Sequence, residues 1–152
     1  MVSKIAMGLF TAGVLALGLS SAAMADAKAS IEAREACMKA NGAMMKVMVP
    51  VIKGQKPYDK AANDAAIAAA EAACAGWAGW WGEDTKPGGD LKTEAKAEIW
   101  TDPAGFEAAG GAYMKAVAAV KASADEASFK AAFPDLGKSC QGCHEKFRQA
   151  DQ

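Results

Sequence analysis

Residues 139–148 read SCQGCHEKFR and contain the only histidine of the 152-residue chain, His144. This imidazole directly follows a Cys-x-x-Cys pair formed by Cys140 and Cys143. Longer segments with helical periodicity precede the stretch, which places it on the last helix of the chain. The position of the motif, together with its residues, therefore indicates the fold.

The spacing Cys-x-x-Cys-His is the attachment signature of c-type haem. Two thiols add to the vinyl groups of the porphyrin, and an imidazole that follows them is a strong axial ligand for the iron. We therefore predict one haem c, bound covalently through Cys140 and Cys143, with His144 as a metal ligand. Three alternatives are weaker. A zinc site lacks a second ligand pair, a thioredoxin-like motif lacks a βαβ context, and a simple disulfide leaves the histidine unexplained.

Residues 1–25 have the features of a secretory signal peptide. Lys4 precedes an apolar run from Ile5 to Leu19, and the segment ends in an A-x-A pattern at Ala25. The run is short for a membrane span, so an uncleaved anchor is the weaker interpretation. We predict cleavage after Ala25, a mature domain of residues 26–152 without a membrane span, and a periplasmic location in a bacterium.

The remaining composition favours an all-α fold. Alanine is abundant and β-branched residues are sparse, which favours helices. Apolar residues at helical spacing predict helices over about residues 29–52, 60–77, 103–122 and 125–148. Because the connections are short, neighbouring helices should be antiparallel, and we predict an antiparallel four-helix bundle with the haem on its last helix. The net charge of −1 suggests no nucleic-acid partner.

Local signals set the expected helix boundaries. Asp59 and Asp102 are N-cap candidates, and Pro103 suits a first helical turn. Pro134 and Gly137 are expected to kink or interrupt the last helix. Residues 54–58 form a turn, 79–90 a glycine-rich loop and 93–100 a short helical turn.

Two further cysteines, Cys37 and Cys74, fall in the first two predicted helices. If these helices form an antiparallel hairpin, the midpoint between the two cysteines lies inside the turn at residues 54–58. The two side chains would then lie at the same height on facing helices, where a disulfide is geometrically feasible. An oxidising compartment favours that disulfide. Two buried free thiols that pack as small apolar residues are the alternative.

The mature chain resembles the class II cytochromes c, a four-helix family that includes cytochrome c′ and the low-spin c-556 type. The resemblance extends over essentially the whole mature chain. It rests on AREACMKANGAMMKVM (residues 33–48), KGQKPYDKAANDAA (53–66), EAKAEIW (94–100) and GKSCQGCHEKFR (137–148).

The resemblance implies two forms of iron ligation. In the c-556 type, a methionine from the first helix closes the sixth position, and the matching residue is Met38, with Met45 as the fallback. In cytochrome c′, the iron is five-coordinate and an apolar side chain covers its far face. The leading hypothesis is a periplasmic one-electron carrier with a low-spin haem ligated by His144 and Met38. The alternative is a five-coordinate, high-spin haem protein that binds NO or CO, in which Met38 is a steric gate.

Two arginines complete the predicted haem site. Arg148 follows His144 by one helical turn, and Arg34 precedes Met38 by one turn. Each is predicted to pair with a haem propionate, and a solvated surface charge is the alternative. Arg34 is also a feature more often met in the cytochrome c′ group.

The sequence contains no recognisable set of catalytic acid, base and nucleophile, so the chain is not expected to be an enzyme. An electron carrier requires transient contacts with redox partner proteins. Because the family often forms homodimers, the resemblance also suggests a homodimer.

Overall fold

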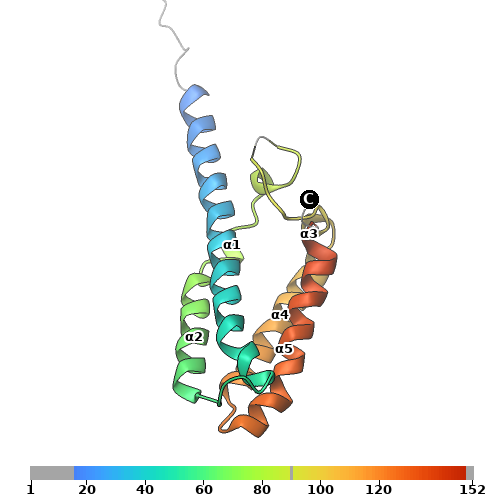
Figure 1. The fold of residues 1–152 in the computed structure, drawn as a ribbon. Coiled ribbons are helices and arrows are strands. Elements are labelled where there is room, and N and C mark those ends of the chain that lie inside the picture. The colour runs from blue at the N-terminus through green and yellow to red at the C-terminus, as the bar shows by residue number, and fades with distance from the viewer. Residues whose placement is uncertain (1–15, 90, 150–152) are drawn as a thin grey trace, which may run out of the picture.

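Four long helices run side by side in the computed structural model, which describes residues 16–89 and 91–149 (Figure 1). The elements are α1 (Ala16–Ile52), α2 (Lys60–Ala73), η1 (Trp77–Gly79), η2 (Glu83–Thr85), α3 (Glu98–Thr101), α4 (Pro103–Lys121) and α5 (Glu126–Phe147). Helices α1, α2, α4 and α5 form the bundle, which confirms the predicted fold class. Within the described ranges, extended pairing is limited to one isolated antiparallel bridge between Ala95 and Arg148.

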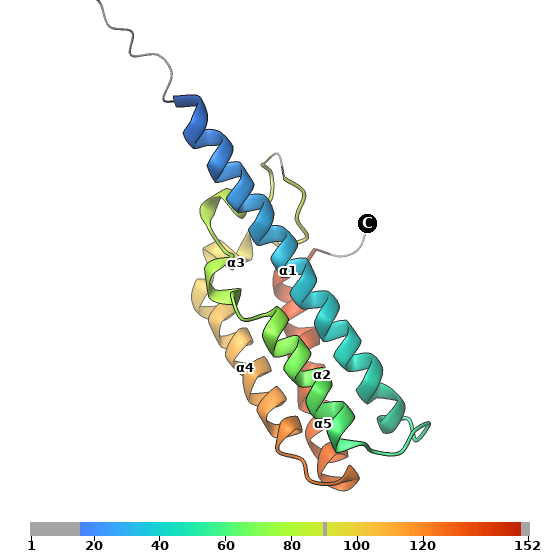
Figure 2. The ribbon, with the colours of Figure 1, turned by 90° about the vertical axis from the view of Figure 1, so that its left-hand side faces the viewer.

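The bundle consists of two antiparallel hairpins. Helices α1 and α2 form one hairpin and α4 and α5 form the other, with the first lying against the second (Figure 2). The turn after α1 includes Gly54, whose φ of 67° suits a residue without a Cβ atom. Figure 1 shows α1 and α5 diverging toward the end of the molecule where α5 finishes.

The helix starts follow the predicted capping residues. Asp59 accepts a hydrogen bond from the backbone N–H of Ala62 at 3.0 Å, and Asp102 accepts one from Gly105 at 3.0 Å. Pro103 occupies the first turn of α4. These N-caps satisfy backbone donors that have no partner inside the helix, and they confirm the predicted caps.

The end of α2 and the course of α5 differ from the predictions. Helix α2 ends at Ala73 rather than near Trp77, because Gly76 and Gly79 follow and glycine disfavours a continuing helix. Helix α5 runs through Pro134 and Gly137 without a break, so the predicted interruption is wrong. An internal proline removes a single backbone hydrogen bond, and the burial of Phe129 and Leu136 on either side holds this helix in place.

Helix α1 begins at Ala16 instead of about residue 29. The added segment contains no proline and is rich in alanine and leucine, which are strong helix formers. Residues 1–15 of the predicted signal peptide lie outside the described residues. The predicted cleavage point after Ala25 falls within α1, so the mature chain would begin with this helix at Asp26.

The buried core occupies the half of the bundle that contains the two hairpin turns. Its members come from all four long helices: Met44, Met48, Val51, Ile67, Ala70, Ala116, Val117, Val120, Phe129 and Leu136. In the part of the chain that the structure describes, no helix combines the length and hydropathy needed to cross a membrane. The core holds the two hairpins together at one end of the bundle. The C-terminal half of α5, which contains the Cys-x-x-Cys-His motif, extends beyond it.

Candidate functional site

The Cys-x-x-Cys-His motif lies on the last two turns of α5. Cys143 and His144 follow Cys140 by three and four residues, so both lie on the same side of the helix as Cys140. The backbone N–H of Arg148 donates to the carbonyl of His144 at 3.0 Å and closes the helix. The helix thus presents two thiols and an imidazole together.

Both thiols are free and half-buried. Burial raises the pKa of Cys140 and of Cys143, and for Cys143 the neighbouring Cys140 adds to the effect. Both side chains are therefore neutral thiols near neutral pH. The thiolate, which is the more reactive form, is therefore the minor form of both side chains.

The imidazole of His144 is also half-buried. Burial lowers the pKa of His144, and the positive charge of Arg148 lowers it further, while Glu94 opposes the shift. The neutral imidazole is favoured, which is the form that binds a metal ion through a ring nitrogen.

The segment before α3 fixes the end of α5. The backbone N–H of Lys96 donates to the carbonyl of Phe147 at 2.9 Å, and the N–H of Gln149 donates to the carbonyl of Glu94 at 2.7 Å. Arg148 Nε lies 2.8 Å from a carboxylate oxygen of Glu94. These contacts hold the turn that contains His144 in a defined position.

On α1, the structure separates the methionines into two environments. Met44 and Met48 are buried in the core, and Met45 packs against it. Met38, one to two turns nearer the N-terminus, is 38% exposed. Since Met44 and Leu136 belong to the same core and the helices are antiparallel, Met38 and the motif both lie beyond the core toward the same end.

Arg34 is buried next to the loop that follows η1. Its guanidinium carbon lies 4.5 Å from the centroid of the Trp81 ring, and Nη2 donates to the carbonyl of Thr85 at 3.4 Å. Nη1 is buried without a hydrogen-bond partner. A carboxylate at that nitrogen would remove the unsatisfied donor, so Arg34 fits the predicted propionate partner.

An aromatic cluster covers this end of the bundle. The ring of Trp81 lies 4.7 Å from Trp77 and 4.7 Å from Phe106, and Phe106 lies 5.2 Å from Phe147 (centroid distances). Trp100 donates through Nε1 to the carbonyl of Trp81 at 2.9 Å. The cluster links Arg34 on α1 to the C-terminal turn of α5.

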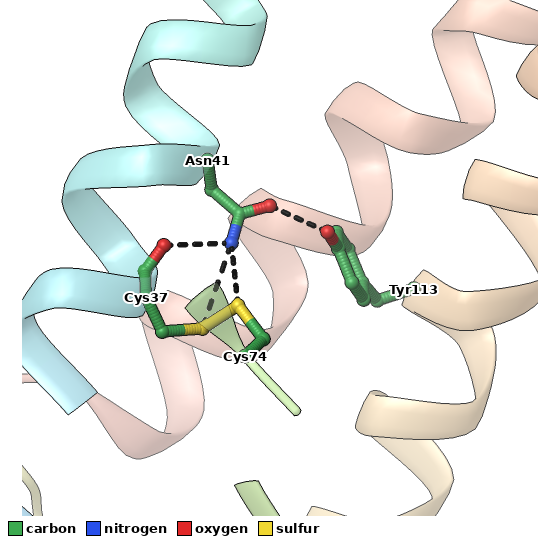
Figure 3. The surroundings of a disulfide bond; sticks show 4 residues. All are labelled: Cys37, Asn41, Cys74 and Tyr113. Carbon is green, nitrogen blue, oxygen red and sulfur yellow. Dashed lines mark hydrogen bonds between the residues drawn. A yellow bond between two sulfur atoms is a disulfide. The ribbon is translucent and has the colours of Figure 1, made fainter. Parts of the chain in front are cut away.

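Cys37 and Cys74 form a disulfide that joins α1 to the end of α2, with a Cα–Cα distance of 4.8 Å (Figure 3). The side chain of Asn41 lies over it. Nδ2 of Asn41 donates to the carbonyl of Cys37 at 2.9 Å and lies 3.3 Å from Cys74 Sγ. Oδ1 accepts a hydrogen bond from the hydroxyl of Tyr113 on α4. A single amide thus connects the disulfide to the second hairpin.

The residues predicted from sequence fall into two groups. Cys140, Cys143 and His144 lie together on α5, and their donor set fits a covalently attached haem with one axial imidazole. Met38 and Arg34 lie on α1, and the propionate role of Arg34 and of Arg148 stays a prediction. Sequence reasoning did not predict the contacts that Asn41, Tyr113 and Trp81 make, because these contacts join segments far apart in the chain.

Comparison with known proteins places these observations in context. The profile of the cytochrome c′ family matches residues 29–148. Cytochrome c-556 of Rhodopseudomonas palustris is 32% identical over 139 residues, which cover 90% of this chain and 93% of the relative. Cytochrome c′ of Alcaligenes xylosoxydans xylosoxydans is 38% identical over 106 residues, which cover 67% and 79%.

The solved structures agree. A ferrous variant of cytochrome c′ from Alcaligenes xylosoxidans with bound NO superposes with a TM-score of 0.71 at 27% identity. The match covers 82% of this chain and 97% of that structure. The range matched by the family profile includes the helix that contains the Cys-x-x-Cys-His motif.

Proposed function

The chain belongs to the cytochrome c′ family, the class II cytochromes c, and from this we propose that it is a c′-type haem protein that binds NO or CO. In this proposal His144 is the only protein ligand to the iron. The observation that carries it is the similarity over most of the chain to a cytochrome c′ structure with bound NO. The comparisons thus favour the hypothesis that the sequence ranked second.

The chain's own residues have separate tasks in this proposal. Ferrous haem with an open axial position binds diatomic gases and also exchanges one electron. Cys140 and Cys143 would each form one thioether bond, so that the cofactor cannot dissociate. His144 would provide a neutral imidazole nitrogen from the same helix face, in an orientation that the contacts of residues 94–96 stabilise.

Met38 would cover the opposite face without ligating the iron. Its side chain is 38% exposed, in contrast to the buried Met44 and Met48 further along α1. A methionine that no core packing holds in place has several accessible rotamers, which suits a movable steric gate. Arg34, with its unpartnered Nη1, would bind a propionate from the side of α1.

A second candidate function is the one-electron carrier with His144 and Met38 as axial ligands. The similarity to a cytochrome c-556 over 90% of the chain favours it. In that case the thioether of Met38 would close the sixth position, favour the low-spin state and raise the reduction potential. Redox partners would bind transiently.

Absorption spectra of the haem-containing protein distinguish the two candidates. For the c′-type protein we expect a high-spin ferric spectrum, a ferrous form that binds CO, and the same spin state in Met38→Leu. A low-spin ferric spectrum with a sulfur-to-iron charge-transfer band that disappears in Met38→Leu would instead favour the carrier. Met114→Leu, which changes an exposed methionine on α4, is the matched control.

Export to a bacterial periplasm is part of the same proposal. The features of residues 1–25 support a cleaved signal peptide. An oxidising compartment also suits the disulfide between Cys37 and Cys74. N-terminal sequencing of the mature protein should give Asp26 as the first residue, and retention of residues 1–25 would contradict export by this route.

A further inference from the structure

The disulfide between Cys37 and Cys74 lies directly beside the residue proposed to cover the haem. Cys37 precedes Met38 on α1, and Cys74 caps the C-terminal end of α2. We propose that this disulfide is a thiol–disulfide switch for the haem site, and that Asn41 and Tyr113 transmit its state to the second hairpin. The proposal rests on the proposed function, since it regulates the same site.

The side-chain amide of Asn41 contacts both sulfur atoms, so its position depends on whether the disulfide is intact. Its Nδ2 lies 3.3 Å from Cys74 Sγ and 3.7 Å from Cys37 Sγ, within hydrogen-bond reach of both sulfurs (Figure 3). After reduction, two thiols cannot remain at bonding distance, so one contact of this amide must lengthen. A thiol, unlike a disulfide sulfur, can also donate a hydrogen bond. After reduction, Nδ2 of Asn41 can therefore face a second donor in place of an acceptor.

The hydroxyl of Tyr113 on α4 connects a movement of the Asn41 amide on α1 to the second hairpin. It donates to Asn41 Oδ1, so the position of the amide determines whether this hydrogen bond forms. Burial raises the pKa of Tyr113 to about 12, so the hydroxyl keeps its proton and remains a donor at neutral pH.

Tyr113 is also next to the motif. It packs against the same core as Cys140, and the two side chains are close enough to interact electrostatically. The path from the disulfide to the first haem-attachment cysteine therefore passes through one amide and one phenol. A change at the disulfide can alter both α1, where Met38 lies, and the packing beside α5.

The reductant in this proposal is a dithiol. Its thiolate attacks Sγ of Cys74, which is partly exposed, whereas Cys37 is buried. The S–S bond breaks, Cys37 leaves as a thiolate and takes up a proton, and a mixed disulfide forms at Cys74. The second thiolate of the reductant then releases Cys74 as a thiol. The dithiol is oxidised to a disulfide, and two electrons and two protons reach the protein.

The test compares the haem-containing protein before and after reduction by a phosphine, with the haem brought to the ferrous state by ascorbate in both samples. Alkylation and mass spectrometry of an aliquot should count no free thiols before reduction and two after it. We expect the rate of CO binding to change by about fivefold or more, a typical size for coupling between sites. Amide hydrogen exchange in residues 38–45 should also become faster.

Two tyrosine variants form a matched pair. Tyr113→Phe removes the hydrogen bond to Asn41, so reduction should change its CO-binding rate much less than in the wild-type protein. Tyr58→Phe removes a hydrogen bond to the carbonyl of Ser123 at the opposite end of the bundle and should respond like the wild type. An unchanged CO rate on reduction, or an equal response in Tyr113→Phe and wild type, would overturn the proposal.

Failure of the proposed function has a different signature. If the protein binds no CO in either state, the c′-type assignment is wrong, and the ferric spectrum then tests the switch. A change in the proportion of high-spin haem on reduction of the disulfide would support it. An unchanged ferric spectrum would exclude it.

Discussion

The imidazole of His144 owes its chemistry to its immediate neighbours. Burial and the charge of Arg148 lower the pKa of His144 and keep the ring neutral. The sequence predicts this histidine and its two cysteines as one site, because their spacing along one helix defines the geometry. It also predicted Arg34 as a site residue, but not the contacts of its guanidinium with Trp81 and Thr85, which come from a loop that no local pattern places beside α1.

Arg34 should contribute to stability as well as to the site. Arg34→Leu removes the contact with the Trp81 ring and the hydrogen bond to Thr85, and we expect the free energy of unfolding to fall by about 2 kcal/mol. Urea denaturation measures this change. Lys39→Ala, which removes an exposed charge 3.8 Å from Glu35, should cost less than about 0.5 kcal/mol. Equal losses in the two variants would show that the Arg34 contacts contribute nothing.

At the scale of the elements, the helix starts with an aspartate N-cap were predictable from the sequence, whereas the start of α1 was not. Asp59 and Asp102 act within three residues of their own positions, so a short stretch of sequence contains the whole interaction. The continuity of α5 through Pro134 depends instead on packing across the bundle, which sequence periodicity does not reveal. The aromatic cluster around Trp81 is likewise formed by residues from separate segments of the chain.

The N-cap aspartates predict an acid-sensitive bundle. A hydrogen bond from Lys146, and then one from the backbone of Gly105, lower the pKa of Asp102 below its ordinary value of 3.8. Hydrogen bonds from Ser128 lower the pKa of Asp125 in the same way. Protonation therefore favours the unfolded chain. The stabilisation is complete above about pH 4 and is lost as the pH falls through the lower, folded-state pKa.

Urea midpoints measured between about pH 5 and pH 2.5 check this prediction. The midpoint should fall with pH in the wild-type protein and fall less steeply in the double variant Asp102→Asn, Asp125→Asn. Asp135→Asn removes a carboxylate that caps no helix and should keep the wild-type slope. An unchanged slope in the double variant would contradict the capping argument.

At the scale of the whole molecule, the bundle has two halves with different roles. The half with the hairpin turns contains the apolar core, and the other contains the motif, the disulfide and the aromatic cluster. The four-helix architecture followed from periodicity and short connections. The separation of the apolar core from the candidate site could not be predicted, because it depends on which turns of antiparallel helices face one another.

The core half should determine global stability. Phe129 is completely buried, and Phe129→Ala should lower the free energy of unfolding by about 3–5 kcal/mol because it leaves a cavity. Met114 is 59% exposed, and Met114→Ala should change the free energy of unfolding by no more than about 0.5 kcal/mol. Both values come from urea denaturation followed by circular dichroism. A small loss in Phe129→Ala would mean that the core is elsewhere.

The central claim is that α5 holds a haem through two thioether bonds. The intact mass of the purified, exported protein, taken with its behaviour in acidified organic solvent, tests this most directly. The account predicts the mass of residues 26–152 plus one haem, with the colour remaining on the polypeptide, and a colourless polypeptide for Cys140→Ala, Cys143→Ala. A mass equal to the bare chain, or a pigment that the solvent extracts, would contradict it.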